Sequence, residues 1–437
     1  MLSKFFFSNL PNGQDWLIQR MLAAGYAVPS QGICFGLSHV GIQAALANDL
    51  QRFWQRLHLI ATCSIQDFSD STIKLLLIKE EIYAFFDTIF LHQKGYLYPE
   101  LFEKEKRPKE QHFLSTYPLV APLNLPNISN PFTCSGVYSP DELIVYFEIL
   151  EDILIQQSVN SPVVFILQNG NHTVAVCYQP QHLAIKTSSK KLAYWHLIDA
   201  NFLSCSENLP AKDTAQRVFK SLSKNKCVLF CTNIYLSLKE DNSEFLTELF
   251  SSLAKRKDWK NIHQPSAEKI SFIGANSYTW SLLAAHYDSQ SLTSLLQQLI
   301  TIPNKKMQMK ILKQTNPTGW NILMICLRLY PKHALTLMHV LKGSEDVLGV
   351  EIIVKQANGD GWNALMIGLC YCSEAVEDLL ILLNTLPRKI FRAVLTQCTA
   401  QGENCLMIAA MTNTFFVPLL LKIIDQSKPR NIKINAI

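Results

Sequence analysis

The length and composition of the chain indicate a folded protein with roughly two or three domains. Its 437 residues are 48% hydrophobic and 10% aromatic, which excludes an intrinsically disordered chain. The net charge of +5 arises in the C-terminal part, because residues from 265 onward carry 16 Lys and Arg against 11 Asp and Glu, whereas 24 of each precede them. These cations form no block, so we expect an acidic protein surface as partner and no nucleic acid.

The cysteines and the apolar segments indicate in which redox environment the protein acts and whether it enters a membrane. The 12 cysteines are irregularly spaced and several lie within apolar runs, which is typical of buried thiols in a reducing environment. They lack the paired spacing of a zinc site, so we expect neither a metal nor another cofactor. No segment reaches the roughly 18 apolar residues of a membrane span, and the first apolar run is too short for a secretory signal peptide. We therefore expect no membrane span and no Sec-dependent export.

The first part of the chain has helical periodicity. Apolar residues recur at helical spacing from Leu37 to Leu57, and a second helix is expected from about Ile73 to Leu91. Many prolines between residues 99 and 140 then predict a long irregular connection. The run from Ser139 to Glu142 has the residues that begin a helix, so a further helix is expected through Ile149.

From residue 163 the pattern changes to short segments rich in β-branched and aromatic residues. We expect strands at 163–167, 173–178, 192–198 and 228–236. Helices followed by an antiparallel sheet imply an α+β domain with segregated layers. We expect this domain to end near residue 240 and a helical linker to occupy residues 241–270.

Internal repetition organises residues 271–437. The string Gly-x-Asn-x-Leu-Met-Ile begins at Gly319, Gly361 and Gly402, and a degenerate first copy follows Thr279. Successive copies are 40, 42 and 41 residues apart, and each continues into a second apolar helix. The spacing predicts about four helical-hairpin repeats. A side-chain oxygen caps a helix N-terminus well, so we expect the asparagine of each string to act as a cap. These residues are Asn321, Asn363 and Asn404.

The repeat unit resembles ankyrin. Its copies match the Gly-x-Thr-Pro-Leu-His-x-Ala box of that family at the glycine, at the capping position and at the leucine. The proline and histidine of the box are absent, and the period is longer than the family's usual one, so longer loops are expected. The resemblance implies an all-α array whose concave face binds a partner protein.

Three further segments carry a candidate catalytic site. Cys34 lies between Gly32 and Gly36 at the start of a helix, where the helix dipole favours a thiolate and the glycines permit a sharp turn and close approach of a substrate. His172 opens one expected strand and Asp199 ends the next. Taken singly, these residues have ordinary interpretations as a buried thiol, a turn residue and a turn cap. Their order instead favours a nucleophile, a general base and a carboxylate that orients the base.

Other residues of the candidate site are less defined. Asn201 is expected to support the turn after Asp199, and Gln31 is a candidate donor to an oxyanion, with the Cys34 backbone N–H as the alternative. Three other histidines compete with His172 for the role of base. They are His39, His182 and His196.

The strings around the candidate triad resemble those of papain-like cysteine proteases, and more closely those of the YopT and AvrPphB class of secreted bacterial effectors. The shared elements are Gly-x-Cys-x-Gly-Leu-Ser at Cys34, Asn-His before a strand at His172, and an Asp-x-Asn turn at Asp199, in which Ala200 replaces the family's proline. The resemblance implies a papain-like cysteine protease domain over residues 1–240 and an attack of Cys34 on a protein amide. Hydrolysis, deamidation and acyl transfer all remain open.

The combination of the two parts resembles the ankyrin-repeat effectors that Legionella delivers through its Dot/Icm type IV secretion system. This resemblance implies a non-Sec route into a host cell and action in the host cytosol or nucleus. It also implies that ankyrin-like repeats over residues 271–437 bind a host protein. The alternative is a non-catalytic scaffold that binds a host protein through these repeats.

Overall fold

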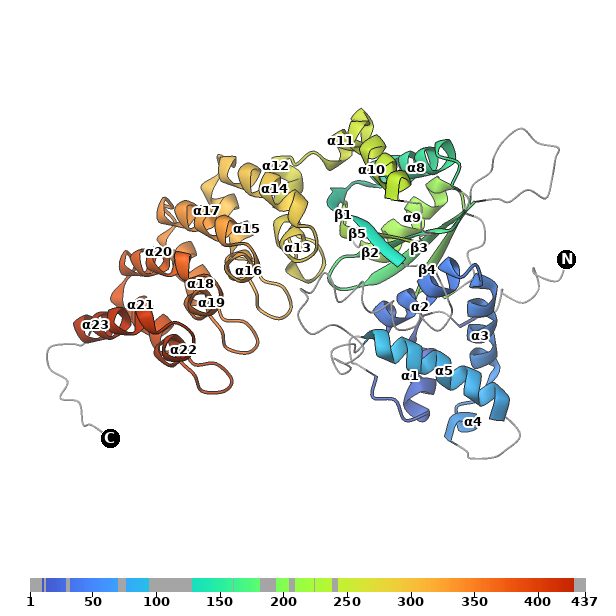
Figure 1. The fold of residues 1–437 in the computed structure, drawn as a ribbon, viewed down its shortest axis with the longest axis horizontal. Helices are drawn as coiled ribbons and strands as arrows, with labels where there is room; N and C mark the ends of the chain where they lie inside the picture. The colour runs from blue at the N-terminus through green and yellow to red at the C-terminus, as the bar shows by residue number, and fades with distance from the viewer. Residues whose placement is uncertain are drawn as a thin grey trace. The chain divides into compact units, whose positions relative to one another are not determined.

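The computed structural model describes residues 10–11, 13–28, 32–69, 76–93, 128–159, 161–180, 194–203, 209–223, 225–237 and 243–427. The chain divides into two compact units, Met1–Gln264 and Pro265–Ile437. The first unit combines helices with one antiparallel sheet, and the described part of the second is helical (Figure 1). The α+β class expected for the first unit is therefore observed.

The N-terminal helices break where the sequence pattern predicted continuity. Instead of one helix from Leu37 to Leu57, the structure has α2 (Cys34–Leu46) and α3 (Leu50–Thr62). Asn48 separates them with a φ of 54°, in the left-handed region that asparagine tolerates better than most residues. The neighbouring helices are α1 (Asp15–Ala23), α4 (Gln66–Ser69) and α5 (Leu76–Gln93).

The sheet has five described strands in the order β1-β5-β2-β3-β4. Four lie close to the expected segments, namely β2 (Val163–Gln168), β3 (Thr173–Gln179), β4 (Tyr194–Asp199) and β5 (Val228–Ser237). The fifth, β1 (Ile128–Tyr138), lies where the prolines predicted an irregular connection, so that part of the prediction was wrong. β1 pairs only with β5, and its register shifts between Ser129 and Phe132, around Pro131. Proline is tolerated at an edge strand and at such an irregularity because no ladder hydrogen bond is lost there.

Helices cover both faces of the sheet. Ser139 begins α8 (Pro140–Gln156) with a reciprocal capping box to Glu142, and α8 packs with α9 (Ala211–Leu222), a helix that the sequence reading did not predict. α2 contacts β2 and β3 on the other face. In β2, Phe165 joins the core on the α8 side and Ile166 joins the core on the α2 side. Burial on both faces explains why β2 is continuously apolar.

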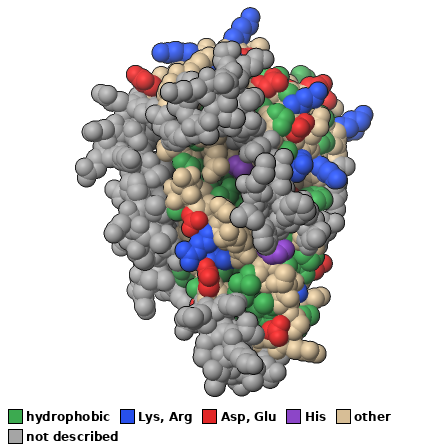
Figure 2. Space-filling model, turned by 90° about the vertical axis from the view of Figure 1, so that its right-hand side faces the viewer, with side chains coloured by type: hydrophobic (Ala, Val, Ile, Leu, Met, Phe, Trp, Pro, Cys, Tyr) green, Lys and Arg blue, Asp and Glu red, His purple; other side chains and the backbone are tan. Residues whose placement is uncertain are grey.

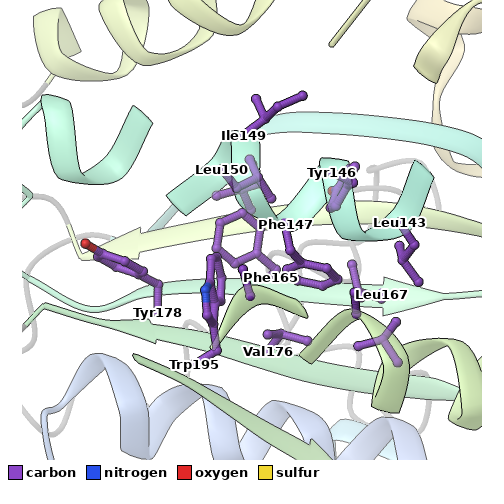
Figure 3. Packing of buried hydrophobic residues seen from close by; sticks show 14 of the residues in the cluster. Leu143, Tyr146, Phe147, Ile149, Leu150, Phe165, Leu167, Val176, Tyr178 and Trp195 are labelled. Atoms are coloured by element: carbon purple, nitrogen blue, oxygen red, sulfur yellow. The ribbon is translucent and has the colours of Figure 1, made fainter. Parts of the chain in front are cut away.

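Aromatic residues form much of the core between α8 and the sheet. Figure 3 shows Phe147 of α8 against Trp195 of β4, with Phe165 and Tyr178 beside them. The rings of Phe147 and Trp195 are 5.4 Å apart between centroids and pack edge to face, a favoured aromatic geometry. This core holds β3 and β4, the two strands that end at the candidate site.

The expected linker over residues 241–270 is divided between the two units. α10 (Ser243–Lys255) and α11 (Lys257–His263) pack on α8 in the first unit, whereas α12 (Ala267–Ser271) packs in the second. Trp259 is buried and stacks on Tyr146, with ring centroids 5.1 Å apart. The amphipathic pattern of these helices therefore reflects core packing rather than a connection.

The second unit consists of repeated helical modules with one more helix than the expected hairpin. The residues expected to lengthen the loops form a third short helix in three modules, because apolar residues on one face of each can be buried. The first module contains η4 (Ala275–Ser277), α13 (Trp280–Tyr287), α14 (Ser289–Thr301) and α15 (Lys305–Leu312). The next two contain α16 (Ile322–Leu329), α17 (Pro331–Lys342), α18 (Val347–Lys355), α19 (Ala364–Tyr371), α20 (Ser373–Asn384) and α21 (Arg388–Thr396). The last contains α22 (Cys405–Thr412), η5 (Thr414–Phe416) and α23 (Val417–Ser427).

The recurring string of the last three modules folds as a glycine turn followed by a capped helix. Gly319, Gly361 and Gly402 have φ near +80°, a conformation that residues with a Cβ rarely adopt. The Oδ1 atom of Asn363 accepts from the N–H of Met366 at 3.0 Å, and Asn321 and Asn404 cap their helices in the same way. Each string thus begins a module.

The described helices can be compared with the expectation that the chain has no membrane span. Across the part of the chain that the structure describes, no helix combines the length and the apolar character needed to cross a bilayer.

Figure 2 shows a face of the molecule on which the described Lys and Arg side chains are interspersed with Asp and Glu side chains. That face matches the balanced charge of the N-terminal part of the sequence.

Candidate active site

Cys34 is the first residue of α2, where the helix leaves backbone N–H groups without intrahelical partners. The chain reaches it through Gly32, whose φ of +90° makes the sharp turn that the sequence pattern predicted. Gly36 has a different role from the expected one. A Cβ there would lie 2.3 Å from the carbonyl oxygen of Ile89, so this glycine permits close packing of α2 on α5 rather than approach of a substrate.

His172 lies in the turn between β2 and β3, and Asn169 organises this turn. The Oδ1 atom of Asn169 accepts from the N–H groups of Asn171 and His172 at 3.0 and 2.8 Å, and its Nδ2 donates to the carbonyl oxygen of Leu222. Ser38 of α2 donates to the carbonyl oxygen of Thr173 at 3.1 Å. The helix that carries the thiol is thereby attached to the strand that begins beside the imidazole.

Asp199 ends β4 and contacts His172 directly. Its Oδ1 atom lies 2.7 Å from Nε2 of His172 and also accepts from the N–H of Asn201 at 2.8 Å. Its Oδ2 atom accepts from the hydroxyl of Ser221, a residue of α9. Asp199 is fully buried, whereas Cys34 and His172 keep 8% and 7% of their surface exposed. The carboxylate is thus held from several sides behind the imidazole.

The thiol of Cys34 and the imidazole of His172 interact and shift each other's pKa. Burial alone would raise the pKa of the Cys34 thiol, but the hydrogen bond and the charge of His172, with the N–H groups of Thr173 and Phe35, bring it below its ordinary value. Burial alone would lower the pKa of His172, but its bonds to Asp199 and Cys34 raise it to about 9. Both directions favour a thiolate beside an imidazolium.

The structure therefore brings Cys34, His172 and Asp199 together. Comparisons with family models, with curated proteins and with solved structures find no match. The chemistry of the site accordingly has to be inferred from its own geometry. With Nε2 of His172 directed at Asp199, the other ring nitrogen is left to exchange a proton with the thiol.

The competing histidines have other surroundings. Nδ1 of His39 lies 2.9 Å from the carbonyl oxygen of Phe35 in its own helix, and its ring stacks on that of His92 with centroids 5.2 Å apart. Burial lowers the pKa of His196 to about 4, with no charged group offsetting that effect. His182 lies outside the described residues. Of the described candidates, His172 has the surroundings of a general base.

Gln31, the expected oxyanion donor, also lies outside the described residues. A different glutamine, which was not predicted from the sequence, lies next to the site. Gln14 accepts from the N–H of Ile33 at 2.8 Å and donates to Oδ1 of Asn201 at 3.3 Å. Nδ2 of Asn201 in turn lies 3.2 Å from Nε2 of His172. Gln14 thus connects the segment before the nucleophile to the turn after Asp199.

Gln14 and Ser221 had no local pattern that would have revealed them. Gln14 is separated from Asn201 by 187 positions, and Ser221 lies in a helix that was not predicted. Asn201, by contrast, was found from its place in the Asp-x-Asn turn.

Proposed function

We propose that this chain is a thiol-dependent enzyme with a papain-like catalytic domain, acting on an amide of a host protein. The observation that carries the proposal is the 2.7 Å contact of His172 with the buried Asp199, together with the interaction of the same imidazole with the Cys34 thiol. The nucleophile lies at a helix N-terminus on one face of the sheet, the base lies in the turn just before β3, and the carboxylate ends the adjacent strand β4. This placement supports the papain-like assignment.

The proposed reaction proceeds through an acyl-enzyme. The Cys34 sulfur forms a bond to the amide carbonyl carbon, and His172 transfers its proton to the amide nitrogen as the C–N bond breaks and the amine leaves. Water then attacks the thioester while His172 takes its proton, and the C–S bond breaks to release the acid and the thiol. An amine in place of water gives acyl transfer, and a side-chain amide as substrate gives deamidation.

The repeats are proposed to be ankyrin-like and to bind a host protein. Support comes from the glycine turns that begin the last three modules, from the capped first helix and the second helix of each module, and from a side chain that links two successive modules, since Gln356 donates to the carbonyl oxygen of Lys313. The third helix is a departure from the ankyrin unit. The resemblance to type IV effectors, together with free thiols at every described cysteine, supports delivery into a reducing compartment of a host cell, in the cytosol or nucleus.

A second candidate function is a scaffold without catalysis, in which the repeats alone do the binding. The observation that favours it is the small exposed fraction of Cys34, only 8%. An enzyme of this kind would need the substrate to reach a nearly buried sulfur. The two candidates differ in the reactivity that they require of Cys34.

An electrophilic activity probe that mimics an acyl group, such as a peptidyl acyloxymethyl ketone, distinguishes them. Wild type should be labelled, Cys34→Ala should not, and His172→Ala should be slower by about 100-fold or more, the range of a lost general base. Cys398→Ala is the matched control, because Cys398 is an exposed free thiol in the second unit. Labelling at the same rate with and without His172 would identify an ordinary thiol and reject the enzyme.

A further inference from the structure

The third helices of three modules occupy equivalent positions in the second unit. α15 contacts α18, and α18 contacts α21 (Figure 1). Their buried residues coincide at steps of 42 and 41 positions: Ile311, Ile353 and Val394 form one set, and Leu312, Val354 and Leu395 form another. The outward positions of these helices are therefore equivalent as well, which makes their side chains directly comparable.

At these outward positions the two outer helices are cationic. α15 exposes Lys305, Lys306 and Lys310, and α21 exposes Arg388, Lys389 and Arg392. Within the described part of the chain, none of these six cations has an ion-pair partner. The only acidic residue on the three helices is Glu351.

The middle helix carries apolar residues at the same positions. Val347 replaces the Lys305 and Arg388 of its neighbours, Leu348 replaces Lys306 and Lys389, and Ile352 replaces Lys310. Their exposed fractions are 49%, 66% and 40%. A surface that served only solubility would keep its cations on all three helices, whereas a cluster of exposed apolar side chains marks a contact. We call the outward faces of α15, α18 and α21 the third-helix surface.

We propose that the third-helix surface docks an acidic segment of a partner protein, with two or three apolar side chains at its centre and carboxylates on both sides. Neighbouring packed helices lie about 8–10 Å apart. In the partner segment, the carboxylates on each side should therefore lie about three residues from the apolar centre if the segment is extended. They should lie about six residues from it if the segment is helical. The proposal deepens the binding role given to the repeats and does not depend on the chemistry at Cys34.

The apolar centre favours a protein over other polyanions. A phosphate backbone would engage the cations but has nothing to cover Val347, Leu348 and Ile352. A bilayer requires apolar side chains that project beyond their surroundings, whereas Val347 and Ile352 are about half buried and the flanking Lys and Arg side chains are longer. A segment with matched apolar and acidic groups satisfies both parts of the surface.

Fluorescence anisotropy with a labelled synthetic peptide tests the proposal on the full chain. The probe has a Leu-Leu-Val centre between two acidic triplets, and a second probe has serines at the centre. Wild type and Cys34→Ala should bind the first probe equally well and bind the serine probe at least about 10-fold more weakly. Leu348→Ser and the double variant Lys306→Glu with Lys389→Glu should each weaken binding of the first probe by about 10-fold or more.

Matched control variants lie on neighbouring helices of the same unit. Ile381→Ser removes an equally exposed apolar residue of α20 (57% exposed), and Lys332→Glu reverses an exposed cation of α17. Both should change binding by less than about 2-fold, and circular dichroism should show every variant folded. No binding by the wild type, equal binding of the serine probe, or tighter binding of single-stranded DNA or phosphatidylserine vesicles would each overturn the proposal. Loss of activity-probe labelling at Cys34 would leave it intact.

Discussion

At Cys34 and His172, burial and the neighbouring groups shift the pKa in opposite directions, and the neighbouring groups have the larger effect. Burial disfavours the thiolate and the imidazolium separately. Placed side by side, the two charges compensate, and Asp199, which also accepts from the N–H of Asn201 and the hydroxyl of Ser221, stabilises the imidazolium from behind. The reactive state of the thiol thus belongs to the pair rather than to Cys34 alone.

The pH dependence of thiol alkylation should show this coupling. Cys34 has a lowered pKa and His172 a pKa raised to about 9, so the thiolate–imidazolium pair exists between these two values. Alkylation of wild type by iodoacetamide should therefore have its midpoint below the roughly 8.5 of a free cysteine. In His172→Ala only burial and the backbone donors remain, and the midpoint should move to higher pH.

The measurement is the rate of Cys34 alkylation between about pH 5 and pH 10, followed by mass spectrometry of the Cys34 peptide. Asp199→Asn should lower the pKa of His172, so the pair should persist over a narrower range that ends at lower pH. Cys398→Ala should leave the profile unchanged. Identical profiles for wild type and His172→Ala would show that the two side chains are not coupled.

The strand and helix boundaries show which elements can be read locally. The four strands and the α8 N-terminus were predicted because β-branched runs and capping residues act within a few positions. β1 was missed because it owes its strand state to pairing with β5, some 100 positions away, so tertiary contacts overrode the local pattern there. α9 was missed although its buried residues recur at helical spacing.

Two capping asparagines of the repeats also bind the third helix of their own module. Asn363 is fully buried, and its Nδ2 donates to the carbonyl oxygen of Val394 at 2.9 Å and to the side chain of Gln397 at 3.1 Å. Asn321 makes the equivalent bonds to Ile353 and Gln356 at the end of α18, the third helix of its own module. Among the described residues, the Asn404 side chain makes only its capping bonds.

Asn363→Ala should therefore destabilise the second unit more than Asn404→Ala. Losing the cap alone should cost about 1 kcal/mol, which is the loss expected for Asn404→Ala. Asn363→Ala should cost about 1–3 kcal/mol more, because a buried carbonyl oxygen loses its partner. Chemical denaturation of fragment 265–437 measures both values. Equal losses would show that the bonds from the capping asparagine to the third helix contribute nothing to stability.

The division of the chain into two compact units predicts that each unit folds on its own. The boundary at residue 264 differs from the expected end of the first domain near residue 240, and the difference is the pair of helices α10 and α11. Trp259 packs on Tyr146, and His263 lies 2.8 Å from the hydroxyl of Tyr138. These contacts close the core of the first unit on the α8 side.

Two fragments test this boundary. Fragment 1–264 should fold and label with the activity probe at the rate of the full chain. Fragment 1–240 should be less stable by at least about 3 kcal/mol, since it lacks Trp259 and the rest of the cover over Tyr146. Urea denaturation followed by tryptophan fluorescence compares them. Equal stability of the two fragments would show that α10 and α11 are dispensable. It would place the end of the first domain near residue 240, as the sequence predicted.

Residue types and short-range order were enough to find the α+β class, the repeat period, the capping asparagines and the three residues of the candidate triad. Each of these features was recognised from residues that lie within a few positions of one another or that recur at a fixed step. Folding alone decided that Gly36 serves helix packing, that Gln14 and Ser221 adjoin the triad, and that apolar and cationic residues alternate across the third-helix surface. Such features depend on contacts between segments distant in the chain, and no local pattern encodes which segments will meet.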